Sequence, residues 1–240
     1  MISRRHALVM GAKGVAALMA SVTALPACRT SAIGVPDSSS GLAGSKRVDW
    51  TVFLESLAAM AQQQFSSDWD QQSHVRDVQA LMELLELDEA HFDALYDGYS
   101  SSMGGFPELN SIHETEHFEV ATVEFDAGDS IPLHNHPDMT GVIQCLVGAV
   151  RVEAFNLLDE PSADGKLKLK RVNDAVLRPG DFSTLTVASG NIHALVAEEH
   201  TALLDVFTPP YNKERKRRYR WYGRSEKPIE GSDVFEAWTL

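Results

Sequence analysis

Two histidines separated by one residue stand at the centre of the segment Ile131-Pro132-Leu133-His134-Asn135-His136-Pro137-Asp138-Met139-Thr140. Side chains alternate between the two faces of a β-strand, so His134 and His136 are expected to point to the same side. Both can then reach one metal ion. A lone pair of this kind is a weak signal, and its meaning depends on the residues around it.

The residues on either side of this pair follow a known spacing. Gly128 stands five intervening residues before His134, Gly148 follows the pair, and Pro179-Gly180 precedes a further histidine, His193, in a later predicted strand. This arrangement resembles the two-part signature of cupins. The resemblance implies a small β-barrel in which the third histidine joins the first two as a metal ligand.

One position departs from the common cupin pattern. The glutamate that many cupins use as a ligand, after four intervening residues from His136, is replaced here by Gly141. The expected ligands are therefore three neutral histidines, which suit iron, zinc, copper or nickel. Such a set leaves the ion its full positive charge and open positions for an anionic substrate and oxygen. A thiol that coordinated the ion would be deprotonated.

Hydrophobic alternation after Gly105 predicts a mainly β fold. The predicted strands, separated by turns, are His117 to Phe125, Val142 to Val147, Val150 to Phe155, Phe182 to Val187, His193 to Ala197 and Ala202 to Phe207. Many short strands at even spacing favour an antiparallel barrel with a ligand site at its mouth. The predicted fold is a cupin-type double-stranded β-helix (jelly-roll) barrel, residues 101–240, with an N-terminal α-helical layer.

The helical layer is predicted over residues 48–100. Apolar residues recur at helical spacing from Trp50 to Ala61 and from Val75 to Leu85, and a third, short helix is expected between Asp88 and Gly98. We interpret this layer as packing that carries no site.

Residues 1–27 have the features of an export signal. Arg4 and Arg5 precede a weakly hydrophobic stretch, residues 14–25, that is too short to span a bilayer, and paired arginines resemble the twin-arginine type. Leu25-Pro26-Ala27-Cys28 resembles a lipobox in which Cys28 would be lipidated. An exported chain without a lipid and an ordinary N-terminal helix stay open as alternatives. We predict an exported protein, periplasmic or membrane-anchored, with residues 28–47 as a flexible tether.

Composition limits the possible partners. Lys and Arg number 21 against 34 Asp and Glu, which gives a formal charge of −13. Such a surface repels phosphate backbones, so no nucleic acid partner is expected. The two cysteines, Cys28 and Cys145, form no disulfide framework, and Cys145 is expected to be a small buried hydrophobe. We expect a monomer.

The local sequence resembles one group of cupins in particular, the cysteamine (2-aminoethanethiol) dioxygenases and plant cysteine oxidases. The resemblance covers roughly residues 105–222. Its landmarks, in order, are the segment 131–140, Gly148-Ala149-Val150-Arg151-Val152, Asn191-Ile192-His193 and Leu204-Asp205-Val206-Phe207-Thr208-Pro209-Pro210-Tyr211. It implies iron(II) held by His134, His136 and His193. It also implies insertion of both atoms of O2 into the sulfur of a small amino-thiol or an N-terminal cysteine, which gives a sulfinic acid.

Asp205 and Tyr211 match positions that surround the metal in that family. The resemblance implies that the carboxylate holds a histidine or a substrate amine, and that the phenol hydrogen-bonds oxygen. A carboxylate at a strand end and a tyrosine packed under the Pro209-Pro210 turn are the structural alternatives.

Several departures from the family leave the substrate open. Asn135, Asp138, Val147 and Tyr219 stand where the family has Asp, Gly, Tyr and Cys, and a basic run occupies residues 213–218 in place of an acidic or polar one. That run either guides an acidic thiol or peptide toward the mouth or forms a solvated loop. Two other functions also stay open: a non-catalytic, metal-binding cupin module that binds a small ligand, and a cupin enzyme of different chemistry.

Overall fold

The computed structural model describes residues 47–87, 105–158 and 165–240. The chain divides into two units, Met1–Lys46 and Arg47–Leu240, and all the described residues belong to the second. The predicted export signal, nearly all of the tether and the third helix lie outside the described residues. Within the three described ranges, no helix is both long enough and apolar enough to cross a membrane.

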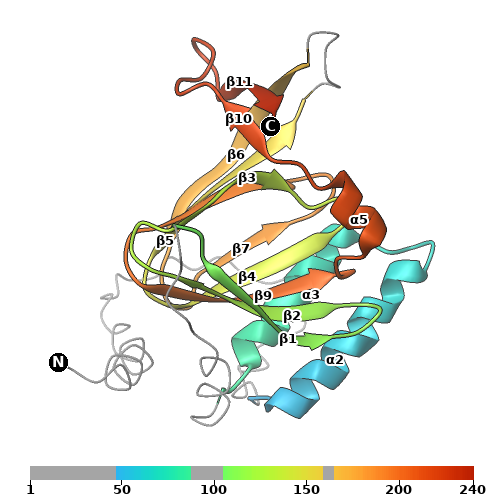
Figure 1. Ribbon diagram of the computed structural model, residues 1–240. Coiled ribbons are helices and arrows are strands. Elements are labelled where there is room, and N and C mark those ends of the chain that lie inside the picture. Colours follow the sequence, from blue (N-terminus) through green and yellow to red (C-terminus); the bar gives the residue numbers. More distant parts are fainter. Residues whose placement is uncertain (1–46, 88–104, 159–164) are drawn as a thin grey trace, which may run out of the picture. The chain divides into compact units, whose positions relative to one another are not determined.

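Two antiparallel sheets form a barrel (Figure 1). One contains, in spatial order, β1 (Glu108–Glu114), β2 (Glu119–Phe125), β9 (Thr201–Thr208), β4 (Thr140–Val147) and β7 (Phe182–Leu185). The other contains β10 (Tyr222–Arg224), β11 (Val234–Thr239), β6 (Lys166–Leu177), β5 (Val150–Leu157), β8 (Ile192–Ala197) and β3 (Ser130–Asn135). The predicted double-stranded β-helix is confirmed, and all six predicted strands are present with ends shifted by at most two residues.

Alternation along β9 shows how the barrel separates its two faces. Leu204 and Val206 pack outward into the core that the helices share, whereas Leu203 packs into the barrel interior. Asp205, between the two outward residues, is therefore turned inward. Cys145 lies in the same interior core and is fully buried, as predicted. Burial raises the pKa of its thiol to about 12, so it stays protonated.

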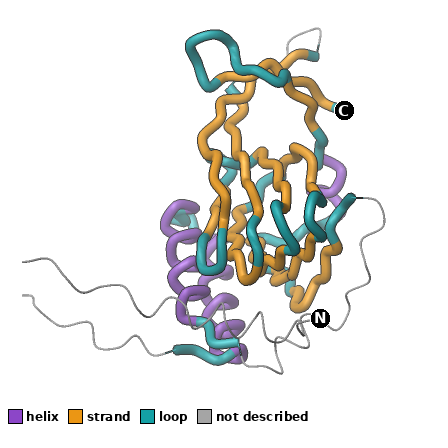
Figure 2. The backbone as a smooth tube through the Cα atoms, turned by 90° about the vertical axis from the view of Figure 1, so that its left-hand side faces the viewer, coloured by secondary structure: helices purple, strands orange, loops and turns teal. Residues whose placement is uncertain are grey.

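The helical layer covers the outer face of the five-stranded sheet (Figure 2). Helix α2 (Trp50–Gln62) continues into the short 3₁₀ helix η1 (Gln63–Phe65), and α3 (Gln71–Leu84) follows. Each α-helix begins at an aspartate, Asp49 or Asp70, whose side chain accepts hydrogen bonds from backbone N–H groups of the first turn. Their apolar faces are buried as predicted. A buried Phe53 or Leu57 contributes about 1.5–3 kcal/mol each.

The loop alternative for residues 213–218 is wrong, because this segment forms helix α5 (Lys213–Arg218). The Asn212 side chain caps it by accepting a hydrogen bond from the Arg215 N–H, 2.8 Å. None of its residues is buried, so no apolar periodicity marked it as a helix.

Candidate metal centre

Three histidine side chains meet inside the barrel. His134 and His136 lie on or just after β3, and His193 lies on β8 directly opposite His134 in the antiparallel pairing. The Nε2 atoms are 3.0 Å apart for His134 and His136, 2.9 Å for His136 and His193, and 3.2 Å for His134 and His193. All three residues are buried. The predicted same-face pair and the predicted third histidine are thus brought together.

The donor chemistry of this cluster fits a metal ion. The His134 Nδ1 lies 2.8 Å from the Pro132 carbonyl oxygen, which can only accept, so Nδ1 carries the proton and Nε2 presents a lone pair. Burial lowers the pKa of His134 to about 4 and the pKa values of His136 and His193 well below the usual range. The rings are therefore neutral at pH 7. Closely spaced neutral nitrogens of this kind can be held together by a cation.

The spacing fits one shared ion. Nitrogens that bind the same ion at about 2.1 Å lie about 3.0 to 3.4 Å apart, depending on the coordination geometry. The observed separations of 2.9–3.2 Å are short enough for all three nitrogens to bind one ion, which His134, His136 and His193 would hold.

No carboxylate completes the group. Among the described residues, the ligand cluster at this place contains only His134, His136 and His193. At Gly141, where many cupins have a glutamate, an added Cβ would lie 3.2 Å from the Leu185 side chain. A leucine of β7 therefore packs against this position, and the donors remain three neutral imidazoles.

Tyr211 contacts one of the three histidines. A tyrosine that only packed under the Pro209-Pro210 turn would not need this contact. Its hydroxyl is 2.7 Å from the His136 Nδ1. If the His136 Nε2 faces a cation, its Nδ1 carries the proton and donates to the Tyr211 oxygen. The phenol hydrogen is then left to donate elsewhere. Burial raises the pKa of Tyr211 above its ordinary value, so the phenol stays protonated.

Aromatic rings hold the imidazoles in place. The His136 ring stacks on Phe207 with centroids 5.3 Å apart, and the His134 ring stacks on Tyr219 at 5.5 Å. Trp221 lies 5.4 Å from His134, and its backbone forms a β-bridge with that residue. These contacts restrict ring rotation, which is how ligand geometry is kept before a metal binds.

Asn191 fixes the backbone of His136 from the other side. Its Oδ1 accepts from the His136 N–H at 3.2 Å, and its Nδ2 donates to the His136 carbonyl at 2.8 Å and to the Thr186 carbonyl at 3.4 Å. The Thr186 hydroxyl in turn accepts from the Gln72 Nε2 of α3 at 3.1 Å. The helical layer, predicted to carry no site, thus contacts the loop that positions one histidine.

The histidines open into a cavity of about 340 Å³ with mostly apolar walls. Its lining includes Val123, Ile131, Ile143, Leu195, Leu203, Phe207, Tyr211 and Tyr219, with Phe106, Leu109 and Lys216. Phe106 and Leu109 are exposed large hydrophobic residues. A cavity of this kind is typical of a small-ligand site.

Asp205 lines this cavity as a buried carboxyl group. Its Oδ1 has no hydrogen-bond partner. Burial, and to a lesser degree the negative charge of Glu119, raises its pKa well above the ordinary value, which favours the protonated carboxyl. A buried polar atom without a partner is costly and is often found where a ligand supplies the missing contact.

Two departures from the family contact one segment. Asp138 has φ 54°, a left-handed conformation that suits the glycine of the family and that aspartate tolerates, and its carboxylate forms an ion pair with Arg218. Asn135 accepts from the Arg220 N–H at 2.7 Å. The residues that flank His136 therefore hold the end of α5 beside the cavity.

A barrel of two antiparallel sheets with three inward histidines defines a metal-binding cupin. The family model PCO_ADO matches residues 100–237, more than half of the chain. The chain belongs to this family of plant cysteine oxidases and 2-aminoethanethiol dioxygenases.

Individual relatives are distant. Plant cysteine oxidase 2 of Arabidopsis thaliana is 31% identical over 115 residues, which cover 46% of this chain and 42% of that protein. The 2-aminoethanethiol dioxygenase of Mus musculus is 32% identical over 144 residues, covering 51% and 56% respectively. The chain thus spans about half the length of these relatives. The solved structure of KdgF from Halomonas sp. gives a TM-score of 0.37 at 19% identity, covering 50% of this chain and 93% of that one.

Several residues of the site were given no individual role in the sequence analysis. Phe207 and Asn191 lie inside the quoted landmarks, and Trp221 lies just after Tyr219. Period-two alternation from Asp205 would have turned Phe207 toward the cavity. Asn191 acts through two backbone contacts, for which the sequence contains no periodic signal.

Proposed function

We propose that this protein is a non-haem iron(II) thiol dioxygenase. It converts a small amino-thiol, or the N-terminal cysteine of a peptide, to a sulfinic acid: one thiol and one O2 give one sulfinic acid, and both oxygen atoms end on sulfur. His134, His136 and His193 would hold the iron. Membership in a family that includes proteins named cysteine oxidase and aminoethanethiol dioxygenase supports this activity.

The single observation that carries the proposal is the set of three neutral imidazoles, with Nε2 atoms 2.9–3.2 Å apart and no carboxylate in the cluster among the described residues. Three histidines can also bind zinc, with water as the fourth ligand, so the choice of iron rests on the family and not on the spacing. Iron accepts imidazole ligands and open facial positions. When bound, iron supplies the redox chemistry that joins a thiolate to O2.

Tyr211 and Asp205 are proposed to act on the reactants rather than on the iron. With the His136 N–H donated to its oxygen, the Tyr211 phenol can donate its own hydrogen to an oxygen atom in the cavity. An ammonium group beside Asp205 would lower the pKa of that carboxyl and pair with it. The apolar walls exclude water, which strengthens both contacts.

Oxygen uptake tests this function directly. Iron-loaded protein is supplied with cysteamine, cysteine or an N-terminal cysteinyl peptide under ¹⁸O2, and the product is analysed by mass spectrometry. We expect a sulfinic acid that carries two labelled oxygens, and no uptake by zinc-loaded protein. Iron-replete protein that binds a small ligand but consumes no O2 with any of the thiols would favour the binding-module alternative.

We also propose export through residues 1–27, with Cys28 either lipidated or left as the mature N-terminus, and a monomeric mature protein. The paired Arg4 and Arg5 support a route for folded, metal-loaded cargo. Replacing both by Lys should retain precursor in the cytoplasm. Unchanged fractionation would argue against this route, and mass spectrometry of the mature N-terminus would report any lipid on Cys28.

A further inference from the structure

Helix α5 brings a concentration of positive charge to an acidic protein. The chain has a formal charge of −13, yet residues 213–218 contain five cationic side chains and one anionic side chain, Glu214. The segment begins two residues after Tyr211 and ends one residue before Tyr219, and both of these tyrosines line the cavity. The basic helix therefore lies between two residues of the site.

The position of α5 is fixed on several sides. Arg215 donates to the Pro210 carbonyl at 3.2 Å, and Arg218 forms its ion pair with Asp138. Asn135 binds backbone groups at the end of the segment, donating to the Arg218 carbonyl at 3.4 Å and accepting from the Arg220 N–H at 2.7 Å. The helix is thus held against the hairpin that carries His134 and His136.

Lys216 is placed differently from the other bases of this helix. Its side chain lines the cavity, and no hydrogen bond or ion pair engages its ammonium group among the described residues. Tyr219, three residues later and so on the same side of a helical turn, stacks on His134. Lys213 and Arg217 do not line the cavity, and Arg215 and Arg218 are engaged.

The cavity therefore has one cation and one carboxyl group. Of the described residues that line it, only Lys216 and Asp205 have ionisable side chains apart from the buried histidines and the two tyrosines. Asp205 is buried, whereas Lys216 is exposed and stands toward the solvent. A ligand whose amine contacts Asp205 can therefore place a negatively charged group at Lys216.

We propose that Lys216 makes this enzyme selective for thiols that carry a carboxylate. The proposal rests on the thiol dioxygenase function proposed above, and it adds the chemical class of the substrate. The carboxylate can belong to a small free thiol or to an acidic residue next to an N-terminal cysteine. Both present the same charge to the lysine, and the experiment separates them.

The expected effect is moderate because Lys216 is exposed. A pair of unit charges at contact distance near water contributes a factor of about five in binding, and less when salt screens it. The preference for the carboxylate should therefore fall as ionic strength rises. An effect of the Lys216 alkyl stem on packing would not depend on salt.

Matched substrates measure the preference. We compare 3-mercaptopropionate with its amide, and the C-terminally amidated dipeptides Cys-Asp and Cys-Asn, by kcat/KM of the iron-loaded protein at low and high salt. Binding of the same compounds to iron-loaded protein without oxygen gives a readout independent of turnover. We expect about fivefold preference for the acid in one pair or in both, and the pair that shows it identifies a free or a peptide carboxylate.

Variants assign the preference to one side chain. Lys216→Met keeps the stem and should abolish the acid-over-amide ratio, and Lys216→Glu should reverse it. Lys213→Met removes the same charge from the same helix outside the cavity and should leave the ratio unchanged. The proposal would be overturned if the wild-type protein used the acid and the amide of each pair equally well. It would also be overturned if the Lys213 and Lys216 variants lost the acid-over-amide preference to the same extent. Absence of oxygen uptake with every thiol would instead contradict the proposed function, while the oxygen-free binding ratios would still test Lys216.

Discussion

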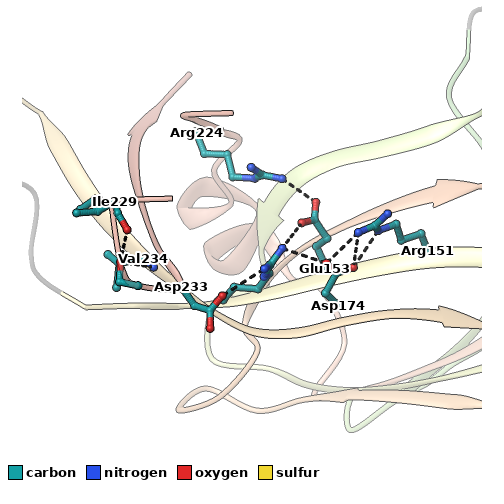
Figure 3. A network of polar contacts seen from close by, with 9 residues as sticks. Arg151, Glu153, Asp174, Arg224, Ile229, Asp233 and Val234 are labelled. Carbon is teal, nitrogen blue, oxygen red and sulfur yellow. Dashed lines mark hydrogen bonds and ion pairs between the residues drawn. The ribbon is translucent and has the colours of Figure 1, made fainter. Parts of the chain in front are cut away.

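Carboxyl groups are paired on the outer surface of the barrel, whereas one carboxyl oxygen inside it has no partner. On the outer surface of β5 and β6, Glu153 is bound by Arg171 at 3.5 Å and by Arg224 at 2.8 Å. Asp174 is bound by Arg151 and Arg171 (Figure 3). Inside the barrel, by contrast, the Asp205 Oδ1 is buried without a partner.

The difference separates groups that hold the fold from groups that are kept for a ligand. Arg224 of β10 also lies over the rings of Phe155 and Phe235, at 5.5 and 4.6 Å, so the outer network joins the C-terminal strands to the barrel. The Asp205 Oδ1 has no such partner, and the three histidines turn their Nε2 atoms toward one another instead of toward groups of opposite charge. Stability is commonly given up in this way at functional sites.

The largest expected effect follows from removing a ligand inside the barrel. His193→Ala should lower activity by more than about 100-fold, because even residues that only support metal ligands can reach losses of that size. Metal content by elemental analysis and oxygen uptake check this. His200→Ala, a histidine outside the cluster, is the control. Full metal occupancy and normal turnover in His193→Ala would remove this residue from the site.

Acid should destabilise the metal-free protein through the same cluster. The pKa of His134 is about 4 in the folded state and about 6.5 in the unfolded state. Between these pH values the unfolded state binds a proton at this residue and the folded state does not. Stability is then complete above pH 6.5 and falls as the pH drops toward 4, by about 3 kcal/mol for this residue.

Asp205 acts in the opposite direction, since its raised pKa favours the folded state as the pH falls from above that pKa toward 3.8. Urea unfolding is therefore best followed in the Asp205→Asn background. A free energy of unfolding that stays constant between pH 7 and 4.5 would contradict the buried, neutral state of the histidines.

Asp205→Asn should separate stability from function. The amide cannot ionise, so turnover of an amino-thiol should fall roughly 10- to 100-fold while most of the metal stays bound. Removing a buried carboxyl without a full set of partners should leave the free energy of unfolding at pH 7 unchanged or raise it by about 1 kcal/mol. Steady-state kinetics and urea unfolding measure the two. A large loss of stability would make Asp205 a structural residue.

Glu153→Gln should give the smallest effect and the opposite pattern. Two arginines lose their charged partner at partly exposed positions, which should cost about 1 kcal/mol of unfolding free energy and leave kcat/KM unchanged. Glu236→Gln, an exposed carboxylate on β11, is the matched control. A change in activity without a change in stability would show that the two regions are coupled.

Local pattern predicted the barrel better than the site. Strands such as β9 were predicted from their runs of apolar residues. The placement of His134 and His136 on one face was predicted from the period of two alone. The placement of His193 depends on the pairing of β3 with β8, which joins distant segments. β6 was missed although Lys166 to Lys170 alternates strictly, because five of its twelve residues are charged. The Tyr211 hydrogen bond depends on the path of the chain after Pro210, which no periodicity encodes.

The cover over β3 has a consequence for the order in which the protein is made. β3 is the last strand of its sheet, and the side away from β8 is bridged by Trp221 and held by Asn135, which binds a residue 85 positions further along the chain. During synthesis, His134 of β3 and His136 just after it emerge well before that segment exists. The growing chain therefore presents an uncovered strand edge, which readily pairs with other strands. The segment that covers His134 can therefore close over it only after translation has passed residue 221.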